Sequence, residues 1–443
     1  MAKRKNIIFY FSDQQRWDTV NETVTPNLMQ LAKEGTLFEN NFTCQPVCGP
    51  ARACLQTGVY ATQCGCYWNG IPLPESITPL AHYFNEAGYD TAYVGKWHLA
   101  SDRLPGIGIH CEATPVPTEK QGEYRYWRAA DVLEFTSHGY DGYIFDGDGN
   151  KLDFTGYRAD CINDFALEYL ESGREADKPF FLFISQLEPH HQNVHHHYEG
   201  YKETVNQYKD YPLPPDLTFL KGDYKEMYPD YISAINRLDY NVGRLVQKLK
   251  DLGIYDDTVI IYSSDHGSHF KTRNLEYKRS CHDSATHTPL IIKGGGFDGG
   301  KAENRLTSLI DLPPTFLSLA GIPVPPSYMG RDLCQMQQTA EPLHDCVFMQ
   351  ISESQCGRAI RTDRFKYAVR TLAPTGYLKY NAGVYFEDYL YDLEKDPIER
   401  CNLIRDPRYS HVRQEMKYLL LREMKNAGEA APVILPALKV RKK

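Results

Sequence analysis

The sequence predicts an α/β fold, with a mostly parallel central sheet sandwiched by helices and a smaller C-terminal α+β subdomain that contains an antiparallel sheet. Over the first two thirds of the chain, short and nearly continuously apolar runs alternate with longer amphipathic stretches, which is typical of strands buried on both faces. The pattern changes near residue 346. We therefore expect one domain over residues 1–345 and a second over residues 346–443.

Four strands of the central sheet are predicted in the first domain, and a polar stretch follows each of them at once. They are expected at residues 6–11, 91–94, 180–185 and 258–262. Thr25 and Pro26 open one helix that Gly35 closes. An apolar stripe over residues 232–249 predicts another helix that ends near Gly253.

The second domain is predicted to hold short strands and one helix. RAIRTDRFKYAVR and YFEDYLYDLEKDP have the β-branched and aromatic content of strands, whereas VRQEMKYLLLREMKNAGE places Leu419, Leu420 and Met424 on one apolar helix face. The proline-rich segment at residues 321–330 and the polar segment at 335–341 form the expected connection between the domains.

Composition excludes several classes of protein. The chain has 443 residues, a formal net charge of −8, and 42% hydrophobic residues, which argues against a dedicated nucleic-acid binder, a polybasic membrane-surface protein and a disordered chain. The N-terminal apolar run covers only residues 7–11, and no stretch reaches the roughly 18 apolar residues of a membrane span. We expect a cytoplasmic protein whose cysteines stay reduced.

The residues that directly follow the predicted strands have the side chains of a metal and anion site. The carboxyl ends of parallel strands meet at one edge of a sheet, where ligands bind in open α/β folds. The polar residues expected there are Asp13, Gln14, Lys96, His98, Glu188, His190, His191, Asp265 and His266. Carboxylates, an amide and imidazoles can ligate a cation, and the lysine can bind an anion.

The segment CQPVCGPARACLQTG places a cysteine at the start of a helix. Pro50 suits a first helical turn and Gly58 ends the helix, so Cys48 is expected at the N-terminus, where free N–H groups and the helix dipole favour an anion. A thiol there is either activated or modified. Arg52, one turn further on, can bind an anionic group or support whatever Cys48 becomes.

Ordered segments along the chain resemble the sulfatase family. CGPAR followed by LQTG is similar to the family signature. SDQQRWD resembles the metal-binding N-terminus of the family, and SSDHG resembles its second metal-binding turn. VGKWHL resembles its Lys and His segment, LEPHH its Pro-His segment, and YDLEKDP its YDL motif. Lys278, eleven residues before Pro289, stands where the family carries its later active-site lysine. The resemblance covers nearly the whole chain and implies an alkaline-phosphatase-like fold and a sulfuric ester hydrolase.

The resemblance also implies a covalent mechanism. In sulfatases a maturation enzyme converts the signature cysteine, here Cys48, to formylglycine (3-oxoalanine); one hydroxyl of its hydrate attacks sulfur, and the other then loses its proton so that sulfate is expelled. Lys96 and Lys278 would neutralise the oxyanion. His98 would take the proton of the hydrate, and His190 or Lys278 would protonate the leaving oxygen.

A divalent cation is the second implied cofactor, held by Asp13, Gln14, Cys48, Asp265 and His266. We expect Ca²⁺. Mn²⁺ and Zn²⁺ are the alternatives, because Gln14 stands where many members carry Asp and His266 where many carry Asn, and less negative charge with an imidazole ligand suits these ions better. The same pattern is similar to phosphonate monoester and phosphodiester hydrolases of the superfamily, which is the main alternative function. A metal phosphatase with unmodified Cys48 and a non-catalytic sulfate or glycan binder also stay open.

Other residues of these types have plainer interpretations. The neighbouring cysteines lack paired metal-ligand spacing, so buried small hydrophobes are expected instead of a zinc or iron–sulfur site at Cys44, Cys54, Cys64 and Cys66. The contiguous His195, His196 and His197 predict a solvated loop. Lys278 and Arg279 could be an exposed basic pair. His282, Asp283 and His287 are candidates for the substrate pocket or for packing.

The expected substrate is a small sulfated saccharide or an aryl sulfate. The tracts HHQNVHHHYEGY and EYRYW could stack on sugar or aryl rings, and the long connections at residues 112–150 and 199–231 are expected to shape specificity. The expected partners are a small-molecule sulfate ester and a formylglycine-generating maturation enzyme, without nucleic acid or membrane. A homo-oligomer is an open alternative.

Overall fold

Parallel strands form the centre of the main sheet. The computed structural model describes residues 4–102, 108, 110–372 and 376–438. In spatial order the central strands are β10 (Thr258–Ser264), β1 (Asn6–Ser12), β9 (Phe180–Ser185), β4 (Asp90–Lys96) and β5 (Tyr126–Ala130). The four predicted strands are therefore confirmed and are immediate neighbours.

Shorter strands extend this sheet to eleven strands at both edges. Beyond β10 lie β11 (Leu290–Lys293), β2 (Thr36–Phe38) and β12 (Lys301–Glu303). Beyond β5 lies β7 (Asp141–Asp146), which pairs with both β6 (Ser137–His138) and β8 (Lys151–Thr155). Antiparallel pairs occur on both sides, as between β10 and β11 and between β5 and β7, whereas the outer pair of β2 and β12 is parallel. A separate small sheet joins β3 (Asn41–Phe42) to β13 (Thr307–Ser308).

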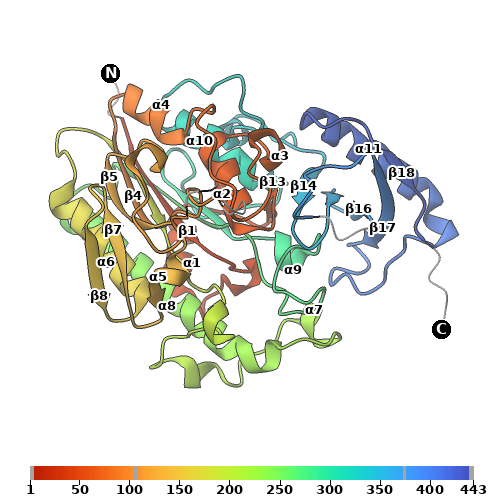
Figure 1. The fold of residues 1–443 in the computed structure, drawn as a ribbon, viewed down its shortest axis with the longest axis horizontal. Helices are drawn as coiled ribbons and strands as arrows, with labels where there is room; N and C mark the ends of the chain where they lie inside the picture. The colour runs from red at the N-terminus through yellow and green to blue at the C-terminus, as the bar shows by residue number, and fades with distance from the viewer. Residues whose placement is uncertain (1–3, 103–107, 109, 373–375, 439–443) are drawn as a thin grey trace.

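Helices cover both faces of the sheet (Figure 1). Successive residues of a strand point to opposite faces, so Ile7, Phe9 and Phe11 of β1 enter one core and Ile8 and Tyr10 enter the other. The helices of the first core are α2 (Cys48–Thr57), α3 (Ala61–Cys64), α4 (Leu80–Glu86) and α10 (Leu312–Leu319). Those of the second are α1 (Pro26–Glu34), α5 (Leu133–Thr136), α6 (Arg158–Glu168) and α8 (Tyr224–Asp251).

Two expectations about connections need correction. Residues 112–150, expected as a long connection, contain β5, α5, β6 and β7, because the run from Tyr126 to Ala130 pairs in parallel with β4. The tract EYRYW accordingly does not form a stacking surface, since Tyr124 and Trp127 are buried in the core. In the 199–231 stretch, α7 (Pro215–Thr218) and the first turns of α8 are helical.

The C-terminal part is a five-stranded sheet with one helix against it, at the right of Figure 1. Its strands are β14 (Val347–Ile351), β15 (Gly357–Arg361), β16 (Phe365–Arg370), β17 (Val384–Asp392) and β18 (Val433–Leu435). The first four are antiparallel as predicted, whereas β18 runs parallel to β17. The helix α11 (Ser410–Asn426) packs Met416, Leu420 and Met424 on one face of this sheet.

The other face of the C-terminal sheet shares a core with the first part of the chain. Val347 and Met349 of β14 pack with Phe42 and Leu306. A buried ion cluster reinforces the junction: Lys366 of β16 contacts Asp283 of α9 (Asp283–Thr286). The division at residues 345 and 346 stays a prediction. No helix among residues 4–102 and the later described segments is both long and apolar enough to cross a lipid bilayer.

Candidate active site

The carboxyl ends of four parallel strands bring the predicted site residues together. Asp13 follows β1, Lys96 ends β4, His190 lies shortly after β9, and Asp265 and His266 follow β10. These strands are neighbours in the order β10-β1-β9-β4, so their ends are adjacent. The site therefore forms at the predicted edge of the sheet.

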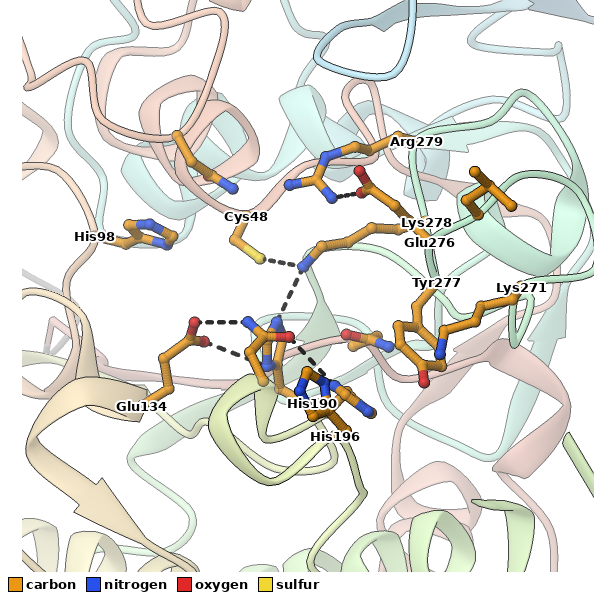
Figure 2. A pocket seen from close by; sticks show the side chains of 15 residues that line it. Cys48, His98, Glu134, His190, His196, Lys271, Glu276, Tyr277, Lys278 and Arg279 are labelled. Atoms are coloured by element: carbon orange, nitrogen blue, oxygen red, sulfur yellow. Dashed lines mark hydrogen bonds and ion pairs between the residues drawn. The ribbon is translucent and has the colours of Figure 1, made fainter. Parts of the chain in front are cut away.

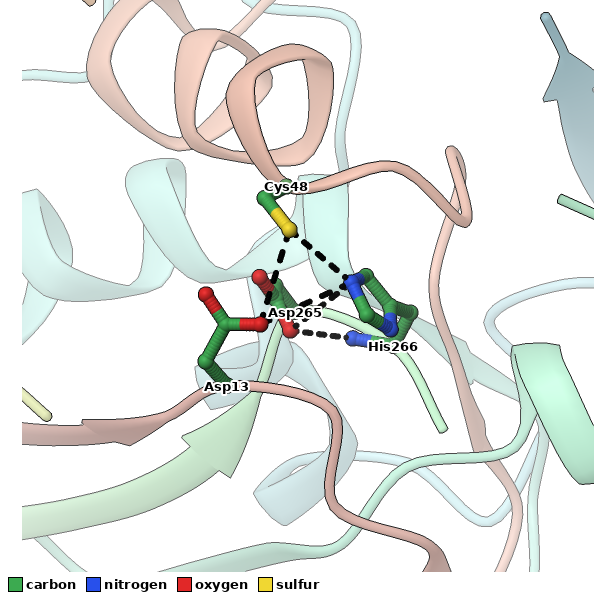
Figure 3. A group of neighbouring side chains, drawn as sticks. All are labelled: Asp13, Cys48, Asp265 and His266. Carbon is green, nitrogen blue, oxygen red and sulfur yellow. Dashed lines mark hydrogen bonds and ion pairs between the residues drawn. The ribbon is translucent and has the colours of Figure 1, made fainter. Parts of the chain in front are cut away.

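Helix α2 presents Cys48 to this edge. It begins at Cys48, as predicted, and ends before Gly58, which adopts a left-handed conformation with φ of 68°. The Gly49 N–H donates to Asn69 Oδ1 at 2.8 Å, so a side chain already caps part of the helix terminus that was expected to be free. The Cys48 side chain is only 1% exposed and points at the strand ends (Figure 3).

Cys48 lies against two carboxylates and an imidazole. Its Sγ is 3.5 Å from Asp13 Oδ1 and 3.2 Å from His266 Nε2. One potential ligand atom from each of Asp13, Cys48, Asp265 and His266 lies within 4.8 Å of the others. His266 Nδ1 is 2.9 Å from the Gly267 carbonyl oxygen, which assigns the ring proton to Nδ1 and leaves the Nε2 lone pair facing the cluster.

The surroundings shift the pKa values of the two carboxylates in opposite directions. Burial and the neighbouring Asp13 raise the pKa of Asp265 to about 7. Burial also opposes ionisation of Asp13, but the positive charges of Lys96 and other nearby groups outweigh it and hold its pKa well below the ordinary value. Asp13 therefore carries the negative charge, whereas Arg52 Nη2, 3.7 Å from Asp265 Oδ2, does not outweigh the effects that raise the pKa of Asp265.

The donor set fits a divalent cation. Asp265 Oδ2 is buried and has no hydrogen-bond partner among the described residues. Burial lowers the pKa of His266 to about 4, so this imidazole is neutral and able to ligate. The amide Nε2–H groups of Gln14 donate to Tyr198 Oη at 2.6 Å and to Ser268 Oγ at 3.2 Å. The amide oxygen is therefore the available ligand atom of Gln14. Carboxylate, amide and imidazole donors suit Ca²⁺, Mn²⁺ or Zn²⁺.

Three cations surround Cys48 and Asp13. Lys278 Nζ is 2.7 Å from Cys48 Sγ, and Lys96 Nζ is 2.8 Å from Asp13 Oδ2. Arg52 Nη2 is 3.0 Å from the same Asp13 oxygen, and its Nη1 donates to the Lys96 carbonyl at 2.9 Å. Burial opposes protonation of both lysines, but nearby negative groups raise the pKa of Lys96 and of Lys278 above the ordinary value. Both lysines are therefore charged near neutral pH.

Cys48 and Lys278 face a cavity of about 400 Å³ (Figure 2). Its wall also includes Gln14, His98 and His190, whereas Asp13, Arg52, Lys96, Asp265 and His266 lie behind Cys48 and are buried. His98 reaches the wall in a left-handed conformation with φ of 61°, and its N–H donates to the Asp131 carbonyl at 2.7 Å. The cavity thus exposes position 48 beside Lys278, His98 and His190, while Asp13, Arg52 and Lys96 lie beneath them.

The structure brings all predicted site residues into one region, but not all of them face the cavity. Arg52 holds Asp13 and the end of β4 rather than facing the cavity, so it supports position 48 from behind. Lys278 is 5% exposed and belongs to the site, which rules out an exposed basic pair with Arg279. Arg279 is instead paired with Glu276 and Glu353.

Several lining residues were not predicted from the sequence, among them Glu134 and Asn69. Glu134, in the helix that follows β5, lies 3.3 Å from His190 Nδ1 through Oε2. Glu134 follows the carboxyl end of the strand at Tyr126–Ala130, so a prediction of that strand would have placed Glu134 at the site edge of the sheet. Asn69 caps the Gly49 N–H, and its own N–H donates to Glu353 Oε1 at 2.6 Å. We find no local sequence pattern that would have identified Asn69.

The remaining candidates are mostly structural. All twelve cysteines are free, and Cys44, Cys54, Cys64 and Cys66 lie in the hydrophobic core, as expected for small apolar residues. His195 and His196 are exposed, in agreement with a solvated loop, although His196 reaches the cavity rim. His197 is only partly exposed, and its Nε2 lies 3.2 Å from Asp230 Oδ2.

The histidine and aspartate candidates at the ends of α9 serve packing and a buried ion pair. His287 stacks on Trp17 with ring centroids 4.4 Å apart, and Asp283 is bound to Lys366. His282 packs edge-on against Tyr389. Among the described residues lining the cavity, none of these three is present.

Known structures share this architecture. A protein solved in complex with its substrate D-glucosamine-2-N,6-O-disulfate superimposes with a TM-score of 0.81 at 23% identity, covering 97% of this chain and 99% of that one. The phosphonate monoester hydrolase of Agrobacterium radiobacter superimposes with a TM-score of 0.68 at 23% identity, covering 96% of each chain. These similarities confirm the predicted α/β fold with its C-terminal subdomain.

Sequence comparisons identify the family. An ulvan-active sulfatase from Formosa agariphila is 27% identical over 452 residues, which cover 96% of this chain and 82% of that protein. The N-sulphoglucosamine sulphohydrolase C-terminal model matches residues 274–426. The Sulfatase model matches residues 5–322, well over half of the chain, and includes every residue of the site. The chain therefore belongs to the sulfatase family.

Proposed function

We propose that this sulfatase hydrolyses a sulfate monoester of a small saccharide or an aryl alcohol at Cys48. One observation carries the proposal: Lys278 lies within 2.7 Å of Cys48 Sγ at the base of an open cavity, while Lys96 and Arg52 add charge behind it. Positive groups that are fixed before substrate binds stabilise a developing oxyanion without reorganisation. A sulfate ester bound over position 48 would meet such an environment.

The two implied cofactors would be held by residues already in place. Conversion of Cys48 to formylglycine would supply a hydrated aldehyde as nucleophile. A divalent cation held by Asp13, Gln14, Asp265 and His266, with position 48, would supply Lewis acidity. The buried acids and the neutral imidazole support this assignment, because they place negative and lone-pair donors around one point.

The remaining residues divide the proton transfers. His98 lines the cavity wall beside Cys48, and we assign it the role of proton acceptor from the group at position 48. Lys278 is charged and faces the cavity, so it can donate a proton to the leaving oxygen. His190 Nε2 lies 3.1 Å from Lys278 Nζ and can accept a hydrogen bond from it. Lys96 would balance charge from beneath.

Hydrolysis of a phosphonate monoester or phosphodiester is the second candidate. It is favoured by Gln14, a neutral ligand where many sulfatases carry a carboxylate, by the imidazole of His266, and by the fold shared with a phosphonate monoester hydrolase. Fewer carboxylates leave more net positive charge at the site, which suits a phosphorus ester as well as a sulfate.

The saccharide assignment rests on similarity and on cavity size. One relative is named as ulvan-active, and a structure of the same fold was solved with a sulfated glucosamine. A cavity of about 400 Å³ can admit a group of that size. The maturation enzyme, the cytoplasmic location and the oligomeric state remain predictions.

Mass spectrometry tests the modified cysteine. Trypsin should release residues 34–52, which contain Cys44 and Cys48. Conversion lowers the mass of this peptide by about 18 Da, and fragment ions should place the loss at Cys48 while Cys44 remains alkylatable. An unconverted peptide from protein that turns over substrate would contradict the formylglycine proposal and favour the metal phosphatase alternative.

Turnover assays separate the two candidate reactions. We expect converted, metal-loaded protein to hydrolyse 4-nitrophenyl sulfate with a higher kcat/KM than phenylphosphonate monoesters. Cys48→Ala should abolish turnover, whereas Cys44→Ala, a buried cysteine four residues earlier, should retain it. A preference for the phosphonate would favour the second candidate, and binding of sulfate esters without turnover would indicate a binder.

A further inference from the structure

The carboxylate of Glu134 has no role in the proposed chemistry, although it borders the cavity. Its side chain is 8% exposed. Oε1 accepts a hydrogen bond from Asn193 Nδ2 at 2.9 Å, and Oε2 lies 3.3 Å from His190 Nδ1 and 3.8 Å from Lys96 Nζ. Figure 2 shows Glu134 on the side of His190 away from Lys278. The carboxylate is thus fixed by an amide and directed at one nitrogen of the imidazole.

The other nitrogen of His190 faces a cation. His190 Nε2 lies 3.1 Å from Lys278 Nζ, which in turn lies 2.7 Å from Cys48 Sγ. Glu134, His190, Lys278 and Cys48 therefore form a continuous chain of polar contacts. An ammonium group can only donate hydrogen bonds, so His190 Nε2 must act as the acceptor in this contact.

Only one tautomer of His190 satisfies both neighbours. Burial and the charge of Lys278 lower the pKa of His190 well below its ordinary value, so the ring is neutral and carries one proton. With the proton on Nδ1, the ring presents an N–H to the Glu134 carboxylate, a 3.3 Å contact that lacks hydrogen-bond geometry in this structure, and accepts from Lys278. With the proton on Nε2, an N–H would face the ammonium group and Nδ1 would face a carboxylate, so neither contact would be a hydrogen bond.

We propose that Glu134 is a positioning residue that holds His190 in the Nδ1–H tautomer and thereby directs the Lys278 ammonium group toward the cavity. The chemical consequence rests on the proposed function: Lys278 transfers one proton to the leaving oxygen as the sulfur–oxygen bond breaks, and becomes a neutral amine that solvent reprotonates. Glu134 does not touch the reacting atoms, and its effect passes through the ring.

The tautomer can be measured without turnover. NMR spectra of the converted, metal-loaded protein labelled with ¹⁵N-histidine report the protonation of each ring nitrogen, and the signals that disappear in a His190→Ala sample belong to His190. These signals should show a protonated Nδ1 and an unprotonated Nε2. Glu134→Met removes the acceptor and should shift the ring toward Nε2–H, whereas Glu134→Gln retains an amide oxygen and should retain most of the Nδ1–H form. An unchanged tautomer in Glu134→Met would overturn the proposal. If this variant does not fold, a wild-type ring protonated at Nε2 would do the same.

Kinetics supply the second test. Glu134→Met should lower kcat on the order of 10- to 100-fold for alkyl or sugar sulfates, whose leaving oxygens need a proton, and less for 4-nitrophenyl sulfate. In a His190→Ala background the same substitution should have no further effect, because its route is gone. Equal losses for both classes of leaving group, or additive losses in the double variant, would contradict the proposal.

A matched control exists on the surface. His195 Nδ1 lies 2.5 Å from Glu199 Oε1, a similar carboxylate–histidine pair outside the cavity wall. Glu199→Gln should leave the leaving-group dependence unchanged. If no sulfate ester is turned over at all, the proposed function fails, while the tautomer of His190 still decides the role of Glu134.

Discussion

Replacing Asp265 with Asn should stabilise the metal-free protein at alkaline pH while abolishing its activity. Burial and Asp13 raise the pKa of Asp265 from its ordinary 3.8 to about 7. At about 1.4 kcal/mol for each pH unit between these values, the ionised carboxylate costs the folded state roughly 4 kcal/mol. Asn retains an oxygen that can accept from the Gln14 and His266 N–H groups, which donate to Oδ1 at 2.9 and 2.8 Å.

The sign follows from proton linkage. Below pH 4 both the folded and the unfolded chain hold the proton on Asp265, and its full contribution to stability is present. Between pH 4 and pH 7 the unfolded chain releases the proton that the folded chain keeps, so the free energy of unfolding falls as pH rises. Above pH 7 this loss is complete. Asp265→Asn has no such proton and escapes the loss.

Thermal or urea unfolding in EDTA at pH 4 and pH 8 measures the effect. The wild-type protein should lose stability relative to Asp265→Asn between the two values, with a change on the order of 4 kcal/mol, and an added divalent cation should restore the wild type only. Asp13→Asn is the matched contrast: it removes the nearest carboxylate of both Lys96 and Arg52 and should destabilise the protein at pH 8. A stability gap between wild type and Asp265→Asn that does not change with pH would refute the reasoning.

Three further outcomes are expected. Lys96→Met should lower kcat/KM on the order of 100- to 1,000-fold with the fold intact, because it removes a buried charge behind position 48; near-normal turnover would remove Lys96 from the mechanism. Lys366→Met should destabilise the protein by about 3–5 kcal/mol, because Asp283 and Glu399 lose their buried cation. The loss should appear as a lower midpoint of urea unfolding. An unchanged midpoint would show that Arg361 is a sufficient partner for Asp283. Chelation should abolish turnover, and Ca²⁺, Mn²⁺ and Zn²⁺ added back separately should identify the preferred cation; full activity in excess chelator would contradict the metal assignment.

The metal and nucleophile region could be predicted from sequence because its residues sit at fixed offsets from buried strands. Asp13, Lys96 and Asp265 each lie at or directly after an apolar run, and parallel strands place such residues at one edge. The antiparallel edges of the sheet were harder to predict, because strands such as β6 and β12 are only two or three residues long and carry little periodicity.

The sequence by itself determined the class of fold, the family and the residues around Cys48, since these depend on local hydrophobic patterns and ordered motifs. Only the tertiary structure showed that Arg52 supports Asp13 from behind, that Asn69 caps the helix beneath the cysteine, and that Glu134 lies against His190. Glu134 and His190 are separated by more than fifty residues and meet because β5 and β9 flank β4 in the sheet. Such contacts depend on strand order and side-chain direction, which no local pattern encodes.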